Sequence, residues 1–451
     1  MVQKNKEYVV DIIDNGCEGE GITKINNFTI FIPGAIKNEK VKILIIKVNK
    51  TYAFGKIIEI LKKSPYRVDS KCSKYKKCGG CNLRHIDYNE TLTIKQSIIQ
   101  NLVNKTLKEK IEVKEVIGME NPYNYRNKLQ YPIGLNKKGE SIMGIFAKRS
   151  HEIIQIDNCL IQNKRSSEIA NEIYKFIYNN KISVYNENTL NGLFRHVVIK
   201  IGVATGQVMC ILIINEDNIP KEKELVNILI KKFPDIKTIV KNINTKNTNV
   251  ILGNKNVNIY GDGYIFDYLG GYTFKISAMS FYQTNPIQTK FLYDYAIKKA
   301  KLNNEDIVLD LYCGIGTISI FTSKYVKKVY GIETVFEAVK DGIENIKLNN
   351  IENCEFINGN VEDIIEDLVN KKHILPDVIF VDPPRKGLDN FTIETILKIK
   401  TKKIIYISCN PSTLARDLYK LKELYNIEEI QPVDMFPFTS HVECVAVLQL
   451  K

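Results

Sequence analysis

The sequence predicts a multidomain α/β protein, in which a small β-barrel and a central α+β domain precede a doubly wound parallel sheet. Three observations support this prediction. The chain has 451 residues, more than one ordinary hydrophobic core accommodates. It begins with short β-rich runs separated by glycine turns, whereas strand and helix patterns alternate from Asn303 onward. We predict three domains, over residues 1–62, 63–275 and 276–451.

The N-terminal barrel is predicted from four runs that are rich in β-branched and aromatic residues: VVDII, FTIFIP, VKILIIKV and FGKIIEIL. Turns such as DNGCEGEG and PGAIKNEK separate these runs. Small barrels of this kind often bind oligonucleotides, so the barrel indicates a nucleic-acid partner.

The charge of the chain also favours a polyanionic partner. The formal net charge is +13, and the segment KKSPYRVDSKCSKYKKC (residues 62–78) carries seven cations against the single acid Asp69. Two tyrosines are interleaved with these cations. This pattern predicts contact with a nucleic-acid backbone. The alternative is a lysine-rich surface without a ligand, because the whole chain favours Lys, Ile and Asn.

The central region begins with a predicted helix over residues 89–107. Its apolar residues recur at steps of three and four, which places them on one helix face: Leu92, Ile94, Ile98, Ile99, Leu102 and Val103. Residues 111–275 mix strand and helix signals, which predicts an α+β domain.

The parallel sheet is predicted from the runs IVLDLY, KVYGIE, NCEFING, DVIFVDPP and KIIYISCN, which alternate with helical patterns. The tail VDMFPFTSHVECVAVLQLK reads as two further strands joined by a polar turn. No apolar run approaches the roughly 18–20 residues of a membrane span. The N-terminus lacks a signal-peptide pattern, so we expect a cytoplasmic protein without membrane association.

A cofactor site is predicted in DIVLDLYCGIGTISI, which reads as strand, glycine turn and helix. Gly314 and Gly316 let the backbone approach a ligand closely. The next strand ends at Glu333, an acidic residue suited to ribose hydroxyls. Ser319 replaces the last glycine of the dinucleotide fingerprint G-x-G-x-x-G. This favours a cofactor with ribose but no pyrophosphate, and S-adenosylmethionine fits.

Two further strand ends carry candidate catalytic groups. In FVDPPRKGL, two prolines stiffen the loop and fix Asp382 at the sheet edge. Cys409 follows the strand in KKIIYISCNPSTLARD, where open α/β sheets place their chemistry. A following helix would favour its thiolate, which predicts a nucleophile; the alternative is a small buried hydrophobe. We interpret five other cysteines as small buried hydrophobes: Cys17, Cys210, Cys313, Cys354 and Cys444.

A metal centre is predicted in CSKYKKCGGC. Cys72, Cys78 and Cys81 follow a C-x5-C-x2-C spacing, and the Gly-Gly turn lets the loop wrap a centre. Cys159, which follows a strand-like run, is the candidate for the fourth ligand. Zinc and a [4Fe–4S] cluster both suit four thiolates. Radical enzymes with iron–sulfur clusters are a further alternative, but they typically use three cysteines in a C-x3-C-x2-C spacing.

These segments together resemble the RNA uracil-5-methyltransferase family, whose members make 5-methyluridine in ribosomal or transfer RNA. The N-terminal region resembles a TRAM domain, an RNA-binding module. CSKYKKCGGCNLRHIDY resembles the family's cluster segment, and YRNKLQYPIG and LFRHVVIK resemble its central domain. The catalytic-domain motifs follow in order: FYQTNP, DLYCGIGTISI, YGIE, DPPRKGL, SCNPSTLARD and FPFTSHVECVAVL.

The resemblance implies an OB-like TRAM barrel, a central domain with an iron–sulfur cluster and a Rossmann-like S-adenosylmethionine-dependent methyltransferase domain. It implies that Cys409 is the nucleophile and Glu443 the base. The implied cofactor contacts are Gln283, Tyr312, Glu333 and Asp382. The implied ligands of a [4Fe–4S] cluster are Cys72, Cys78, Cys81 and Cys159. The resemblance favours 23S rRNA over tRNA as the RNA partner, and we expect a monomer.

Two alternative functions remain at this stage. Cytosine-5 methylation of RNA also uses a cysteine nucleophile, so only the modified nucleoside separates the two reactions. The second alternative is a non-enzymatic RNA-binding iron–sulfur protein that has kept a methyltransferase fold. The presence of both Cys409 and Glu443 argues against it.

Overall fold

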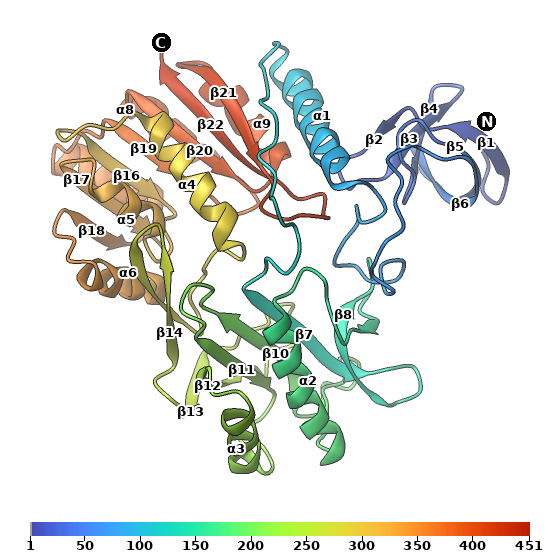
Figure 1. Cartoon of the computed structure of the whole chain (residues 1–451). Coiled ribbons are helices and arrows are strands. Elements are labelled where there is room, and N and C mark those ends of the chain that lie inside the picture. Colours follow the sequence, from blue (N-terminus) through green and yellow to red (C-terminus); the bar gives the residue numbers. More distant parts are fainter. Residues whose placement is uncertain (1) are drawn as a thin grey trace.

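The computed structural model describes residues 2–451, which form three large β-sheets, a two-stranded hairpin and the helices that cover them (Figure 1). The first sheet has the strand order β1-β5-β6-β4-β3-β2. Its strands are β1 (Glu7–Asp11), β2 (Asp14–Asn15), β3 (Gly21–Ile25), β4 (Phe28–Ile32), β5 (Lys40–Val48) and β6 (Tyr52–Lys62). The edge strands β1 and β2 are consecutive in the chain, so the sheet curls back on itself around an isoleucine- and valine-rich core. The predicted small barrel is confirmed.

The second sheet occupies the centre of the chain, with the order β13-β12-β11-β10-β7-β8-β9. Its strands are β7 (Lys128–Leu135), β8 (Ser141–Phe146), β9 (Ile153–Gln155), β10 (Phe194–Ile201), β11 (Val208–Ile214), β12 (Ile236–Ile243) and β13 (Lys255–Tyr260). Helices α2 (Lys164–Asn179) and α3 (Glu222–Lys232) contribute buried residues to the core of this sheet. The hairpin β14 (Tyr264–Leu269) and β15 (Tyr272–Ser277) follows.

The third sheet has the order β18-β17-β16-β19-β20-β22-β21. Its strands are β16 (Ile307–Leu311), β17 (Lys328–Glu333), β18 (Cys354–Asn358), β19 (Val378–Val381), β20 (Lys403–Ser408), β21 (Tyr425–Val433) and β22 (Glu443–Leu450). The first five of these in chain order are parallel, as predicted, whereas β22 runs antiparallel between β20 and β21. The strand order reverses between β16 and β19, which is where open α/β sheets bind ligands.

Helices on both faces bury the apolar strands of this sheet, as expected for parallel strands. They are α4 (Pro286–Ala300), α5 (Thr317–Ser323), α6 (Phe336–Leu348), α7 (Val361–Glu366) with the π-turn η1 (Asp367–Lys371), α8 (Asn390–Ile399) and α9 (Pro411–Leu421). No helix within residues 2–451 is long and apolar enough to cross a bilayer.

Helix α1 (Tyr88–Leu107) confirms the helix predicted over residues 89–107, and it packs on the third sheet rather than on the second. Its buried residues Ile99, Val103 and Leu107 share a core with Leu414 of α9. In Figure 1, α1 lies between the barrel and the C-terminal sheet. Core packing thus crosses the limit that we predicted at residue 275, and the predicted domain limits stay predictions.

The tail differs from its prediction. Only one strand, β22, lies beyond Val433, because its partner β21 ends there. Residues 434–442 between the two strands form an irregular segment, here called the 434–442 loop. Apolar residues at Met435, Phe436 and Phe438 resemble a strand in sequence. Their backbone carbonyls, however, bond to distant side chains and loops instead of to a neighbouring strand.

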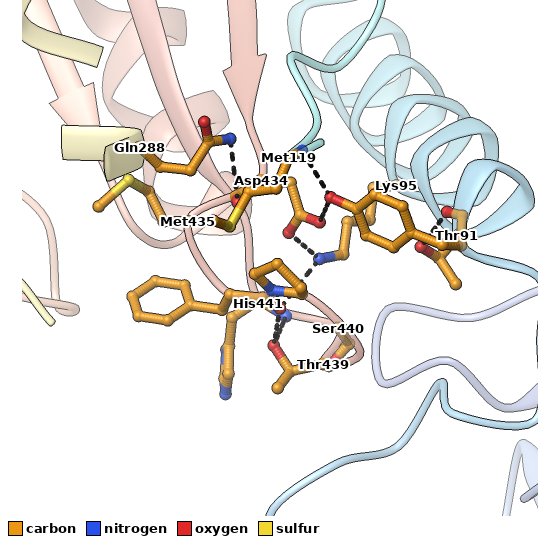
Figure 2. Close-up of polar contacts among 12 residues, drawn as sticks. Thr91, Lys95, Met119, Gln288, Asp434, Met435, Thr439, Ser440 and His441 are labelled. Atoms are coloured by element: carbon orange, nitrogen blue, oxygen red, sulfur yellow. Dashed lines mark hydrogen bonds and ion pairs between the residues drawn. The ribbon is translucent and has the colours of Figure 1, made fainter. Parts of the chain in front are cut away.

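A buried ion pair joins α1 to the start of the 434–442 loop (Figure 2). Lys95 Nζ lies 2.6 Å from Asp434 Oδ1, and the two side chains are 1% and 0% exposed. Tyr88 donates its hydroxyl proton to the other carboxylate oxygen of Asp434 at 2.9 Å. Both charges are therefore paired in the protein interior, so the removal of either one would leave the other buried without a counter-charge.

We expect Lys95→Met to destabilise the protein by about 3–5 kcal/mol, because it leaves the Asp434 carboxylate buried without its cation. The double variant Lys95→Met/Asp434→Asn should recover part of this loss, since asparagine carries no charge. Urea unfolding of the single and double variants measures both effects. A single variant as stable as the parent would contradict the prediction.

Candidate active site

The candidate active site lies at the carboxyl edge of the third sheet. Four predicted residues follow or end neighbouring parallel strands there: Tyr312 after β16, Glu333 at the end of β17, Asp382 after β19 and Cys409 after β20. Because these strands are adjacent and parallel, their carboxyl ends share one edge, next to the reversal of strand order. All four residues are partly exposed, so ligands can reach them.

The glycine turn after β16 is tied to Glu333. Tyr312, Gly314 and Gly316 all have left-handed backbone conformations, with φ of 64°, 56° and 80°. The Gly314 N–H donates to Glu333 Oε2 at 3.1 Å. A Cβ on Gly316 would lie 2.1 Å from the Phe356 ring, so no other residue fits this position. The turn therefore presents its backbone and a fixed carboxylate to the same space.

Apolar side chains beside Glu333 remain exposed to solvent. Val335 is 52% and Phe336 64% exposed, directly after the strand that ends in the acid. A carboxylate for ribose hydroxyls next to an apolar surface suits a nucleoside, because a purine ring gains from leaving water. The sequence analysis did not single out these two residues.

Gln283 approaches the site from the segment between β15 and α4. It is 9% exposed, and its backbone carbonyl accepts a hydrogen bond from Asn127 Nδ2 at 3.0 Å. Phe281, two residues earlier, is 65% exposed. An exposed aromatic ring of this kind can stack on a nucleic-acid base. The sequence analysis missed Phe281, because alternating apolar residues do not reveal which ring is left uncovered.

Cys409 and Glu443 come together through the pairing of β20 with β22. Ser408 pairs with Cys444 in this antiparallel ladder, so the next residues along the register, Cys409 and Glu443, face each other at its end. Glu443 is 4% exposed, and its Oε2 has no hydrogen-bond partner within the described chain. A buried carboxyl oxygen without a partner is costly, and such groups are typical of functional sites.

The electrostatics of the site favour neutral forms in the RNA-free protein. Burial raises the pKa of Cys409 to about 11, with further upward contributions from Glu443 and Asp382, while Arg385 acts in the opposite direction. Burial also raises the pKa of Asp382 and, to a greater extent, that of Glu443. Burial and the two carboxylates thus oppose the thiolate that the following helix would favour, and the expectation of a ready thiolate stays a prediction.

We expect alkylation of Cys409 by iodoacetamide to rise about tenfold per pH unit and to level off near pH 11, because only the thiolate reacts. Glu443→Gln should move this profile to lower pH, since it removes a negative charge that opposes ionisation of the thiol. Mass spectrometry of the Cys409 peptide measures the rate separately from the other cysteines. A profile centred near the ordinary value of 9.0 would contradict the predicted shift.

The Asn410 side chain has a structural role, because its polar groups form hydrogen bonds within the protein. Its Oδ1 accepts from the N–H of Ser412 and caps α9, and its Nδ2 donates to the Arg385 carbonyl at 3.0 Å. It thereby fixes the loop after Asp382 against the segment that carries Cys409. Both groups of its side chain are engaged within the protein.

The four cysteines predicted as ligands line one small cavity. Cys72, Cys78, Cys81 and Cys159 face it together with Arg84. Arg84 is 4% exposed, and its positive charge offsets part of the burial that raises the pKa of Cys81 to about 11. Within residues 2–451, no three His, Cys, Asp or Glu side chains are arranged to hold a single metal ion.

The remaining cysteines agree with their interpretation as small buried hydrophobes, with one exception. Cys17 is exposed at the barrel surface, so that interpretation is wrong for it. The buried members of the group are Cys210, Cys313, Cys354 and Cys444.

The cations of the basic segment are exposed apart from one. Its six lysines face solvent, whereas Arg67 donates to the buried Glu39 carboxylate at 2.7 Å and holds the end of the barrel. Arg67 is thus a structural residue, and the lysines remain available to a polyanion.

The third sheet and its edge define the class of the protein. The strand order, the inserted antiparallel β22 and the glycine turn with its acid are those of a Rossmann-like S-adenosylmethionine-dependent methyltransferase. Among solved structures, the Pyrococcus abyssi tRNA (uracil-54, C5)-methyltransferase in complex with S-adenosyl-L-homocysteine is 26% identical, with a TM-score of 0.75. The match covers 98% of this chain and 100% of that one.

The chain belongs to the tRNA (uracil-5-)-methyltransferase family, whose profile matches residues 87–451, and residues 2–58 match the TRAM domain. An "uncharacterized RNA methyltransferase" of Clostridium acetobutylicum is 46% identical, over 99% of this chain and 98% of that protein. A Bacillus cereus protein of the same description is 42% identical, over 100% and 98%. The protein is therefore an S-adenosylmethionine-dependent RNA methyltransferase of the uracil-5 class.

Proposed function

We propose that the protein methylates carbon 5 of a specific uridine in RNA through a covalent bond between Cys409 and carbon 6 of uracil. The observation that carries this proposal is the pairing of β20 with β22, which sets Cys409 opposite the buried Glu443 at the cofactor edge. A nucleophile and a base beside a methyl-donor site are what this reaction requires.

The chemistry follows from the uracil ring. Carbon 5 is a poor nucleophile. Once Cys409 has lost its proton to solvent, its thiolate can add to carbon 6 and convert the ring into an enolate with electron density on carbon 5. S-adenosylmethionine, when bound, supplies the sulfonium methyl group that carbon 5 accepts. Glu443 then takes the proton left on carbon 5, the C5–C6 double bond re-forms, and the Cys409 sulfur leaves with its electron pair. Burial raises the pKa of Glu443, which makes its carboxylate a better proton acceptor.

Four residues would hold the methyl donor: Gln283, Tyr312, Glu333 and Asp382. The Glu333 carboxylate would accept hydrogen bonds from the ribose hydroxyls. The uridine must leave its stack to reach this edge, and an exposed ring such as that of Phe281 could stack on an unpaired base.

The RNA substrate we favour is 23S rRNA, with tRNA as the second candidate. The TRAM region and the cysteine segment underlie this preference. The Pyrococcus abyssi protein is named for a tRNA position, and its match covers 98% of this chain and so extends into the barrel. This similarity is the reason for keeping tRNA as the second candidate. Mapping of 5-methyluridine in both RNAs from a deletion strain tests the assignment. Loss from neither RNA, or the appearance of 5-methylcytidine as the missing nucleoside, would contradict the proposal.

We further propose that Cys72, Cys78, Cys81 and Cys159 hold a [4Fe–4S] cluster. Four thiols around one cavity fit this group. Each thiolate ligand of a [4Fe–4S] cluster binds a different iron atom, so the four cysteine sulfurs do not converge on a single point. Thiolates around one zinc ion would lie only about 3.8 Å apart. Bound there, the cluster would link the cysteine segment to the segment between β9 and α2, which carries Cys159.

We expect the anaerobically purified protein to contain about four iron atoms per chain. Cys159→Ser should lower this ratio, whereas Cys17→Ser, a change at the exposed cysteine outside the cavity, should not. Metal analysis measures both. Removal of iron should weaken folding or RNA affinity; an unchanged fold and RNA affinity would contradict a structural or RNA-orienting role.

A further inference from the structure

The 434–442 loop leads directly into Glu443, and groups from distant segments hold its backbone. Five consecutive carbonyl oxygens, those of residues 434–438, each accept a hydrogen bond from outside the loop. The donors are Gln288, Asn285, Lys95, Tyr125 and the N–H groups of Asn82 and Leu83. An irregular segment with every one of these acceptors paired is held in one conformation, despite the lack of a neighbouring strand.

The first half of the loop is fixed from α1 and α4, as Figure 2 shows. Lys95 bonds both the Asp434 carboxylate and, at 3.3 Å, the Phe436 carbonyl. Gln288 donates to the Asp434 carbonyl at 3.3 Å and to the Ile117 carbonyl at 3.0 Å. Asp434 and Met435 are fully buried in this half, whereas Phe436 is partly exposed.

The second half of the loop is fixed from the cysteine segment. Asn82, the residue after Cys81, accepts from the Ser440 N–H at 2.8 Å and donates to the Ser440 hydroxyl at 2.9 Å. Its own N–H and that of Leu83 donate to the Phe438 carbonyl at 3.2 and 3.0 Å. Phe438 has a left-handed φ of 64°, which a phenylalanine adopts only when its surroundings impose it.

Aromatic and cationic packing strengthens the same contact. The Arg84 guanidinium lies 4.2 Å from the Phe438 ring centroid, and the rings of Tyr88 and Tyr123 lie at 5.7 and 5.2 Å. Arg84 also lines the cysteine cavity. The segment that carries Cys81 thus contacts the 434–442 loop through a backbone pair, a side-chain pair and a stacked cation.

We propose that Asn82 is a positioning residue for Glu443, and that the cysteine segment therefore acts on the second half of the reaction. This inference rests on the proposed role of Glu443 as the base. Asn82 fixes Ser440, three residues before Glu443, and so sets the direction from which the carboxylate meets the proton on carbon 5. Attack by Cys409 and transfer of the methyl group precede that step and do not require it.

The test separates bond formation from release. With RNA that contains 5-fluorouridine, the proton on carbon 5 is replaced by fluorine, so the rate of adduct formation reports attack and methyl transfer alone. With ordinary RNA, the covalent fraction at steady state reports release. We expect Asn82→Ala and Ser440→Ala to form the 5-fluorouridine adduct at the parental rate, but to release product about 10- to 100-fold more slowly.

A second readout is the pH dependence of the covalent fraction with ordinary RNA. This fraction should fall as pH rises, because more Glu443 is ionised, and so able to take the proton, at higher pH. Asn349→Ala is the matched control. Asn349 also pairs with one residue in both directions, donating to the Thr273 carbonyl at 2.7 Å and accepting from its N–H at 2.8 Å, far along the chain from the loop. It should change neither rate.

The outcomes distinguish the positioning role of Asn82 from the proposed role of Glu443 as the base, on which it rests. Parental release in both Asn82→Ala and Ser440→Ala, while Glu443→Gln accumulates adduct, would overturn the positioning role and leave the base in place. Slower adduct formation with 5-fluorouridine RNA in both variants would also overturn it, because attack would then depend on Asn82. If Asn82→Ala loses iron or fails to fold, Ser440→Ala decides alone, since Ser440 lies outside the cysteine segment and the change removes the hydrogen bond that its hydroxyl accepts from Asn82.

Discussion

Replacement of Cys409 by alanine is expected to abolish 5-methyluridine formation and, with it, the denaturation-resistant adduct on 5-fluorouridine RNA. The thiolate is the only group that we assign to carbon 6, so the variant loses the step that activates carbon 5. We expect a fall in turnover of about four orders of magnitude or more. Transfer of label to RNA from a donor with a tritiated methyl group measures methylation, and a denaturing gel of the fluorinated complex measures the adduct.

Cys444→Ala is the matched control for this variant. Cys444 lies on β22 beside Glu443, pairs with Ser408 and is fully buried. Its loss removes a thiol from the same sheet without touching the proposed nucleophile, so adduct formation should persist. A Cys409→Ala protein that still forms the fluorinated adduct would refute the nucleophile.

Glu443→Gln is expected to accumulate a covalent complex with unmodified RNA. Glutamine keeps the shape of the side chain but cannot take the proton from carbon 5, so the methylated adduct forms and does not resolve. Loss of a general base costs about 10²- to 10⁴-fold in turnover. A shifted band on a denaturing gel, followed over time with ordinary RNA, measures the trapped complex.

Glu429→Gln provides a control on the neighbouring strand β21. Its carboxylate lies 2.6 Å from Lys299 Nζ and accepts the Tyr295 hydroxyl at 2.7 Å, so it is an acid of the same sheet with a structural pairing. No adduct should accumulate with this variant. Turnover of Glu443→Gln at the parental rate would exclude Glu443 as the base.

The parts of the fold that follow from local patterns were predictable. The strands β16, β19 and β20 are largely apolar runs that lead directly into candidate site residues, and α1 has its apolar residues at helical spacing. The acids and Cys409 at the strand ends follow from the same argument, because parallel strands share one carboxyl edge. This edge therefore required no knowledge of contacts between distant residues.

Other features depend on contacts that the sequence does not display. Lys95 reads as a solvent-facing lysine, yet it is buried because Asp434, far away in the chain, neutralises it. The 434–442 loop reads as a strand, but donors from distant segments pair its carbonyls. Cys409 reads as a thiolate at a helix start. The burial and the carboxylates that raise its pKa appear only when β22 is placed beside β20.

The antiparallel insertion of β22 has a consequence for folding. This strand is interior, bonded on one side to β20 and on the other to β21, and both of these strands precede it in the chain. The strand that leads to Cys409 therefore keeps an unpaired edge until β22 has docked beside it. The proposed nucleophile and the proposed base are brought together only by that docking step, so a chain that is cut before residue 443 should hold the proposed nucleophile without the proposed base.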